Sequence, residues 1–174
     1  MSLRIGGVKR DRFLRRAGQA GPAFGDVQYN GGPTIACPRI HAAFWGTLWS
    51  DATHRAQAAR LVQFLKDVIA SDWMNILSQY GAGTGKNSGV FTGQSFNANV
   101  SGTLSDGGIH AALQAQINSG AIPEPPGRNT SDVVMIFLDE SVAVKDDNVA
   151  VMCEPSGDNA FGYHNSFTTA KGSR

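Results

Sequence analysis

Hydrophobic residues recur every three or four positions between Ala58 and Ile69, with polar residues between them. This spacing is typical of one face of an amphipathic α-helix and is the clearest periodic signal in the chain. Polar residues that can accept hydrogen bonds from the free N–H groups of a first helical turn precede it: Ser50, Asp51 and Thr53. The pattern therefore predicts a helix that begins near these residues.

Two further helices are predicted downstream. A short one runs through residues 73–80, where the apolar and aromatic residues suit a core rather than a cofactor site. A longer one begins at Ser105 or Asp106 and runs through Ile117. Gly120 stands at its C′ position, where a residue in the left-handed conformation often ends a helix.

Segments rich in β-branched and aromatic residues predict the strands. Residues 133–138 form a nearly continuous apolar run, which suits a strand buried on both faces. The other predicted strands are residues 39–46, 90–100, 142–144, 149–152 and 160–167. Strands that alternate with helices predict one α/β or α+β domain over residues 31–174, with a mixed sheet and helices mainly on one face.

The net charge of +1 over 174 residues gives no general case for a nucleic-acid, membrane-surface or acidic partner. Six Lys and Arg residues lie within residues 4–16, with Asp11 as the one acid there, and we interpret residues 1–30 as a basic, loosely ordered leader. No continuous apolar region marks an intact signal peptide, and no run approaches the ~20 apolar residues of a membrane span.

Four groups of residues invite a chemical interpretation that we do not favour. The glycine-rich stretch at residues 81–89 departs from a phosphate-binding loop, because Tyr80 replaces the first glycine and Asn87 the Ser or Thr, so we interpret it as a connector. Cys37 and Cys153 lie outside any zinc-binding spacing and are either a disulfide or two buried thiols.

The histidines and the acidic pair after residue 138 are the other two groups. His41, His54 and His110 fit no metal motif and are interpreted as structural or exposed residues. Asp139 and Glu140 point to opposite faces if the strand continues, so a solvated turn is the simpler account.

Six segments in one order resemble bacterial relatives of the exordium-like, phosphate-induced proteins. The segments are residues 29–33 (YNGGP), 44–46 (FWG), 71–80 (SDWMNILSQY), 104–106 (LSD), 133–138 (VVMIFL) and 161–167 (FGYHNSF). Longer members are zincin-like, with a further strand and a helix bearing a Ser-His-Glu signature. The resemblance implies a protein exported from the cell, secreted or periplasmic, with a zinc-hydrolase ancestry.

The resemblance also implies a candidate site around one histidine. His164 and Tyr163 are the expected catalytic residues, and Gly162 and Asn165 are expected to contact substrate. Because the sequence stops at Arg174, short of such a metal-binding helix, we expect it to behave as a truncated form with no evident cofactor or metal ligands of its own. Zinc is expected only where another chain completes the site.

The sequence thus leaves three functions open. The first is a hydrolase-like protein related to zincin-type metallohydrolases but without the metal-binding helix. The second is a noncatalytic binding or assembly module that uses an open sheet edge, either as a homodimer or with a complementary chain. The third is a metal-independent ester or glycoside hydrolase built from Asp139, Glu140, His164 and a serine.

Overall fold

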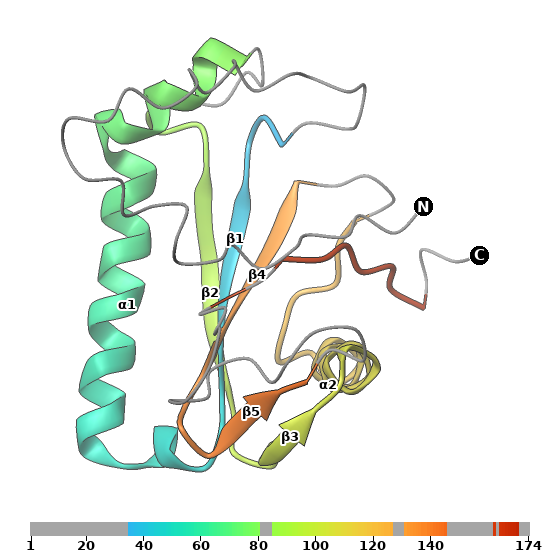
Figure 1. Cartoon of the computed structure of the whole chain (residues 1–174). Coiled ribbons are helices and arrows are strands. Elements are labelled where there is room, and N and C mark those ends of the chain that lie inside the picture. Colours follow the sequence, from blue (N-terminus) through green and yellow to red (C-terminus); the bar gives the residue numbers. More distant parts are fainter. Residues whose placement is uncertain (1–34, 81–84, 127–130, 146–161, 163, 171–174) are drawn as a thin grey trace, which may run out of the picture.

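The computed structural model describes residues 35–80, 85–126, 131–145, 162 and 164–170. The elements in chain order are β1 (Arg39–Trp45), η2 (Leu48–Ser50), α1 (Ala52–Ala70), η3 (Asp72–Tyr80), β2 (Val90–Asn97), β3 (Gly102–Leu104), α2 (Asp106–Asn118), β4 (Asp132–Leu138) and β5 (Val142–Val144). Figure 1 shows α1 and α2 flanking a group of long strands, with the short strands β3 and β5 beneath them.

The long strands form one parallel sheet with the order β2-β1-β4. β1 is the central strand, and all seven of its residues are paired with both neighbours, from Arg39 opposite Val90 and Asp132 to Trp45 opposite Asn97 and Leu138. β3 and β5 form a separate, two-stranded parallel sheet. Neighbouring parallel strands need a crossover connection, and α1 lies within the crossover from β1 to β2.

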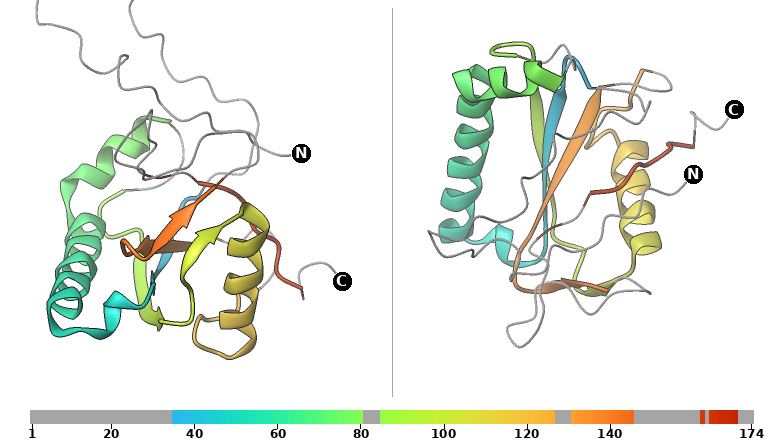
Figure 2. Two further views of the ribbon diagram at one scale, coloured as in Figure 1. Left: turned by 60° about the horizontal axis from the view of Figure 1, so that its bottom comes forward. Right: turned by 45° about the horizontal axis from the view of Figure 1, so that its top comes forward.

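β1 supplies both cores of the molecule because successive side chains of a strand point to opposite faces. Ala42 and Phe44 belong to the cluster on the α1 face, whereas Ala43 and Trp45 belong to the cluster on the α2 face. All four are completely buried. Figure 2 shows the resulting three layers, with α1 and α2 on either side of the sheet.

The α1 face is built around aromatic contacts to Phe44. Its ring lies 5.1 Å from that of Phe96 on β2, 5.2 Å from that of Phe137 on β4 and 5.0 Å from that of Trp49. The buried residues of α1 that pack on this cluster are Ala58, Val62 and Leu65, members of the predicted periodic pattern. Asp51 caps the helix by accepting a hydrogen bond from the His54 N–H at 2.9 Å, as predicted.

The α2 face contains a buried polar pair. Trp45 Nε1 donates a hydrogen bond of 2.6 Å to Gln116 Oε1, so the buried indole N–H is satisfied by a residue of α2. Apolar residues of α2 surround this pair: Ile109, Leu113 and Ile117. Ser105 caps the helix, and Gly120 has a positive φ of 76°, which confirms the two predicted helix boundaries.

The predicted α/β class is confirmed, with several differences of detail. The predictions placed the helices mainly on one face, whereas α2 covers the face opposite α1. Residues 73–80 are helical but of the 3₁₀ type, and β2 ends at Asn97 rather than Val100. β3 was not predicted. No helix within the described ranges is both long and apolar enough to cross a membrane.

The strand predicted at residues 160–167 was wrong for the residues that the structure describes there. Residues 164–169 are in neither helix nor strand. Their polar groups bond to side chains of α2 instead of to a sheet, as described below. The leader at residues 1–30 and the strand predicted at residues 149–152 lie outside the described residues.

Candidate functional site

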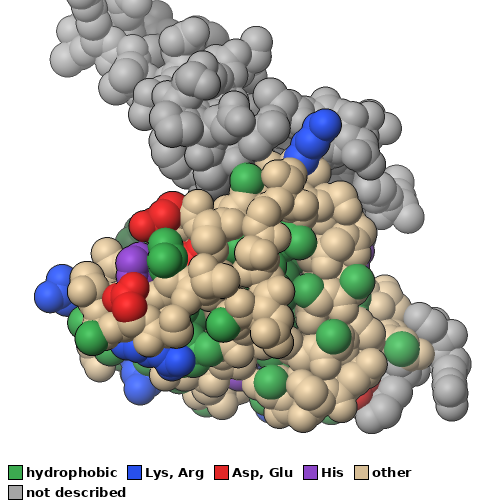
Figure 3. All heavy atoms as spheres, turned by 90° about the horizontal axis from the view of Figure 1, so that it is seen from below, with side chains coloured by type: hydrophobic (Ala, Val, Ile, Leu, Met, Phe, Trp, Pro, Cys, Tyr) green, Lys and Arg blue, Asp and Glu red, His purple; other side chains and the backbone are tan. Residues whose placement is uncertain are grey.

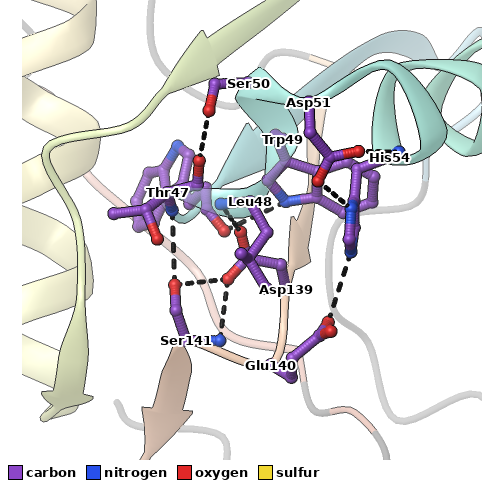
Figure 4. A network of polar contacts seen from close by, with 10 residues as sticks. Thr47, Leu48, Trp49, Ser50, Asp51, His54, Asp139, Glu140 and Ser141 are labelled. Atoms are coloured by element: carbon purple, nitrogen blue, oxygen red, sulfur yellow. Dashed lines mark hydrogen bonds and ion pairs between the residues drawn. The ribbon is translucent and has the colours of Figure 1, made fainter.

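The loops at the carboxyl end of the parallel sheet are the first place to look for a site, because ligands of open α/β sheets commonly bind there. β1 is followed here by η2 and the start of α1, and β4 is followed by the turn to β5. Figure 3 views this end of the molecule and shows acidic and histidine side chains next to one another on one side of it. Figure 4 shows the polar network that joins these loops.

Asp139 is the structural anchor of this end. Its carboxylate accepts hydrogen bonds from Leu48 N at 2.7 Å, Ser141 N at 2.8 Å and Ser141 Oγ at 2.5 Å. Asp139 is only 5% exposed, so the prediction of a solvated turn was wrong for this residue. The cause is the approach of the loop after β1, whose N–H groups take the place of water around the carboxylate.

The pKa of Asp139 reflects two opposing effects. Burial alone raises the pKa, because it disfavours the charged form. The hydrogen bonds from Ser141 and from the backbone N–H groups of Leu48 and Trp49 lower it, and the net result is a pKa below its usual range. Asp139 is therefore a filled acceptor that holds two loops together, not a carboxylate ready to act on a substrate.

Gly46 makes the approach of these loops possible. It has a φ of +130°, a conformation that side chains rarely adopt, and a Cβ at this position would lie 2.1 Å from Asp139 Oδ1. A side chain at residue 46 and the Asp139 carboxylate cannot occupy this space together. The Phe-Trp-Gly segment therefore places its glycine where the backbone of one loop meets the anchor of the other.

His54 joins α1 to the turn after β4. Its Nδ1 lies 2.5 Å from Asp51 Oδ2, and its Nε2 lies 3.5 Å from Glu140 Oε2. Desolvation by itself lowers the pKa of His54, but the hydrogen bonds and charges of Asp51 and Glu140 outweigh it and raise the pKa above its usual value. The pKa of Asp51 is lowered, first by the hydrogen bond from the backbone N–H of His54 and then, against a smaller opposing effect of desolvation, by the hydrogen bond and charge of the His54 ring.

This acid–histidine–acid group does not suit a single metal ion. The two carboxylates meet opposite nitrogens of one ring, so an ion bound at one nitrogen would face only one of them. In the parts of the chain that the structure describes, no three His, Cys, Asp or Glu side chains gather as metal ligands would. His54, which the sequence analysis interpreted as a structural or exposed residue, serves here as a bridge between two segments.

A buried histidine–serine pair lies inside the sheet. His41 Nε2 on β1 is 3.2 Å from Ser95 Oγ on β2, and both residues are buried. Burial lowers the pKa of His41, and its Nδ1 has no hydrogen-bond partner within the described ranges. A serine beside a neutral histidine is the chemistry of an activated nucleophile, but neither side chain is more than 7% exposed, so substrate has no access in this conformation.

The predicted site residues lie elsewhere, beside α2. Gly162 and His164 are exposed, and Tyr163 lies outside the described residues. Asn165 Nδ2 donates to the two carboxylate oxygens of Asp106 at 3.2 and 3.3 Å. These contacts tie the segment to the start of α2, so the structure does not bring His164 to the acidic pair after β4.

Other contacts complete the docking of this segment on α2. The Phe167 ring lies 5.4 Å from that of His110, and Ala170 N donates to Gln114 Oε1 at 2.8 Å. The predicted connector after η3 is similarly bound rather than open: Lys86 N donates to Asn75 Oδ1 at 2.9 Å, and Asn87 N donates to Ile69 O at 2.9 Å. Cys37 is exposed, and Cys153 lies outside the described residues.

The outer edge of β4 is a candidate interaction site that side-chain chemistry does not reveal. The Ser131 carbonyl accepts from Arg39 N, and Asp139 N donates to Trp45 O, so the odd-numbered residues of this stretch face β1. The N–H and C=O groups of Asp132, Val134, Ile136 and Leu138 therefore point away from β1. The described part of the chain places no strand against them.

The other edge of the sheet, along β2, is protected. Thr92 is an extra residue that bulges the strand opposite Ile40 and His41, and its Oγ1 bonds to the Ile40 carbonyl at 3.0 Å. Bulges of this kind hinder the addition of a further strand. β4 has neither a bulge nor a lysine, a proline or a glycine, and six of its seven residues are apolar.

Comparisons with protein-family models, with curated proteins and with solved structures find no match. The resemblance to the exordium-like proteins therefore stays a prediction, and the case for function rests on the geometry above.

Proposed function

We propose that this chain is an assembly module that forms a homodimer by pairing the outer edge of β4 with the same edge of a second copy. The observation that carries the proposal is the contrast between the two sheet edges. β2 is bulged and polar, whereas β4 is regular, apolar and open in the described part of the chain. An edge of that kind is a template for strand addition.

The register of such a dimer follows from the direction of the backbone groups. Two copies related by a two-fold axis pair their β4 strands antiparallel, with Met135 of each copy on the axis. Val134 then lies opposite Ile136 of the second copy, and all of these outward N–H and C=O groups find partners. The two three-stranded sheets become one continuous sheet with the order β2-β1-β4-β4-β1-β2.

Side chains support the same register. Val134 and Ile136 both pack against the α2-face cluster, so they meet on one face of the extended sheet. Met135 and Phe137 pack against the α1-face cluster and meet their counterparts on the other face. Apart from Asp132 at the end of the stretch, apolar side chains thus lie opposite apolar side chains, and such cross-strand pairs each stabilise a sheet by roughly 0.2–1 kcal/mol.

Charge does not oppose the pairing. Asp132 is the only charged residue of β4, and its Oδ1 already lies 3.1 Å from Nε of Arg39 in its own chain. In the proposed register Asp132 stands at the end of the paired stretch, opposite Leu138 of the second copy. No two like charges face each other across the axis.

The test uses the position of Met135, which faces Met135 of the second copy across the two-fold axis. In Met135→Lys and in Met135→Glu, two like charges face each other on the axis, and each variant is expected to be monomeric. Met135→Leu keeps an apolar residue of similar size and is expected to dimerise like the original chain. The masses in solution are measured by light scattering during size-exclusion chromatography and by sedimentation equilibrium.

A mixture of the Lys and Glu variants makes the test specific for the register. The opposite charges face each other only in a dimer of one Lys chain and one Glu chain, so mixing the two monomers is expected to restore a dimer that high salt weakens. A monomeric original chain, or a dimer that survives Met135→Lys, would overturn the proposal. If the chain formed a complex only with a different protein, the partner at the β4 edge would not be a second copy, and the homodimer proposal would be wrong.

Hydrolysis, the function that the resemblance implies, stays a prediction with its own test. Purified protein is assayed with peptide, ester and glycoside reporters, with and without a chelator, beside the His164→Ala variant. Turnover that EDTA removes and zinc restores would support a metal site completed by another chain. Turnover that His164→Ala leaves unchanged would contradict the expected role of His164.

A further inference from the structure

We infer that Asp51, His54 and Glu140 form a pH-sensitive latch that fastens the start of α1 to the turn after β4. The latch lies at the carboxyl end of the parallel sheet (Figure 4), and it is independent of the proposed dimer. Glu140 directly follows Asp139, the residue that anchors the loop after β1, so the latch acts on the same turn as the anchor.

Only a doubly protonated ring can donate to both carboxylates at once. His54 Nδ1 faces one carboxylate and Nε2 faces another, and a ring nitrogen can donate to a carboxylate only if it carries a proton. The neutral ring has one N–H, so it can hold either Asp51 or Glu140, but not both. Loss of one proton therefore opens one side of the bridge.

The Glu140 side is the weaker one. Its Oε2 lies 3.5 Å from the ring nitrogen and its side chain is 74% exposed, whereas the Asp51 contact is 2.5 Å long and within the same helical turn. Upon deprotonation, the ring keeps the proton that faces Asp51 and releases Glu140. The contact that is lost is the one that joins two segments distant in sequence.

The charged and aromatic groups around His54 come from three elements. At the N-cap of α1, Asp51 faces the ring. Arg55, the next residue after His54, is turned to β2, where its guanidinium carbon lies 3.6 Å from the centre of the Phe96 ring. From η2 the Trp49 ring meets that of His54 edge-on at 5.8 Å. From the turn after β4 comes Glu140. Among the residues that the structure describes, two acids and no cation face the ring, which favours its charged form.

The pH range of the latch follows from the pKa directions. The folded pKa of His54 is raised, so the bridge is complete below the unfolded value of about 6.5 and is lost as pH rises through the folded value. The folded pKa of Asp51 is lowered, so its side of the bridge persists in mild acid and is lost only below about pH 4. The latch is closed between these limits and opens towards alkaline pH.

The test follows the latch residue by residue with nuclear magnetic resonance on the full chain. The ring resonances of His54 give its titration midpoint, and the backbone amides of Glu140 and Ser141 report on the turn. These amides are expected to titrate with the midpoint of His54 and to lose that step in His54→Gln. His110→Gln is the control, because His110 lies at the start of α2 beside a single carboxylate, 3.8 Å from Asp106.

Two further variants separate the sides of the bridge. Asp51→Asn preserves the helix cap, because Asn is as good a cap as Asp, but removes the charge, and it is expected to lower the His54 midpoint. Glu140→Gln is expected to lower the midpoint by less and to abolish the titration step at Ser141. Amides of the turn that do not follow His54, or a midpoint that neither substitution lowers, would overturn the latch.

Discussion

Replacement of Gly46 by alanine should be one of the most damaging single-methyl changes in this chain. Residue 46 has a φ of +130°, and a Cβ there would lie 2.1 Å from Asp139 Oδ1 and 2.2 Å from its Cγ. The carboxylate cannot simply turn away, because Leu48 N and the two donors of Ser141 fix it in place. The substitution therefore meets two separate costs.

The magnitudes of these costs can be worked out. Holding a residue with a side chain in this backbone region costs about 1–3 kcal/mol. Displacing the Asp139 carboxylate breaks at least one hydrogen bond to a charged group, which costs about 1.5–3 kcal/mol. The sum, about 2.5–6 kcal/mol, is a large part of the 5–15 kcal/mol that typically separates the folded and unfolded states of a domain.

Urea unfolding followed by circular dichroism measures this loss, with Gly120→Ala as the matched control. Gly120 also has a positive φ, of 76°, but a Cβ there would meet no atom within 4 Å. Gly120→Ala is expected to cost only the backbone strain of the left-handed conformation, about 1–2 kcal/mol. The difference between the two variants contains the collision with Asp139 together with the difference in backbone strain between a φ of +130° and one of 76°.

A double-mutant cycle gives the result that would refute this reasoning. In an Asp139→Ala background the carboxylate is absent, so Gly46→Ala should cost about 1.5–3 kcal/mol less than it does in the original chain. An equal cost in both backgrounds would show that the two residues do not meet as described. A cost of Gly46→Ala no greater than that of Gly120→Ala would lead to the same conclusion.

Two other predictions concern stability. Gln116→Ala removes the acceptor of the buried Trp45 indole N–H and should lower the free energy of unfolding by at least about 1–3 kcal/mol. Gln114→Ala changes a partly exposed residue of the same helix and should lower it by less, and urea unfolding measures both variants. Asp139→Asn should destabilise the chain at neutral pH, but the difference should shrink as pH falls below about 4. The sign follows because a group whose folded pKa is lowered adds stability above its unfolded pKa and loses that stability in acid. Unfolding curves at several pH values measure the difference between the two proteins, and a difference that does not change with pH would contradict the prediction.

The helices were predictable because their signals are local. The apolar period of α1, its Asp51 cap, the Ser105 cap and Gly120 all act within one or two turns of the chain, and each is found where the sequence placed it. β4 was predictable from composition alone. β3 was not, because Gly102–Leu104 has only three residues and becomes a strand through its pairing with β5, which lies far along the chain.

The polar network at the carboxyl end could not be predicted, since its partners are distant in sequence. Asp139 is buried by the loop that follows β1, about ninety residues earlier in the chain, and nothing near Asp139 in the sequence signals that loop. His54 similarly meets Glu140 only through the fold. Conversely, the aromatic residues after Gly162 favoured a strand, but Asn165 instead bonds to Asp106 and the segment lies along α2.

The central position of β1 also sets an order of events during synthesis. Its ladder with β2 joins residues 52 apart at His41 and Gly93 (93 − 41 = 52), whereas its ladder with β4 joins residues 93 apart at Arg39 and Asp132 (132 − 39 = 93). The longer loop costs only about 0.5 kcal/mol more to close, so what separates the two ladders is timing. A ribosome releases β1, α1 and β2 long before β4, and until then one side of the most buried strand in the molecule has no partner. The nascent chain is thus most exposed to aggregation through the same strand that later carries both cores.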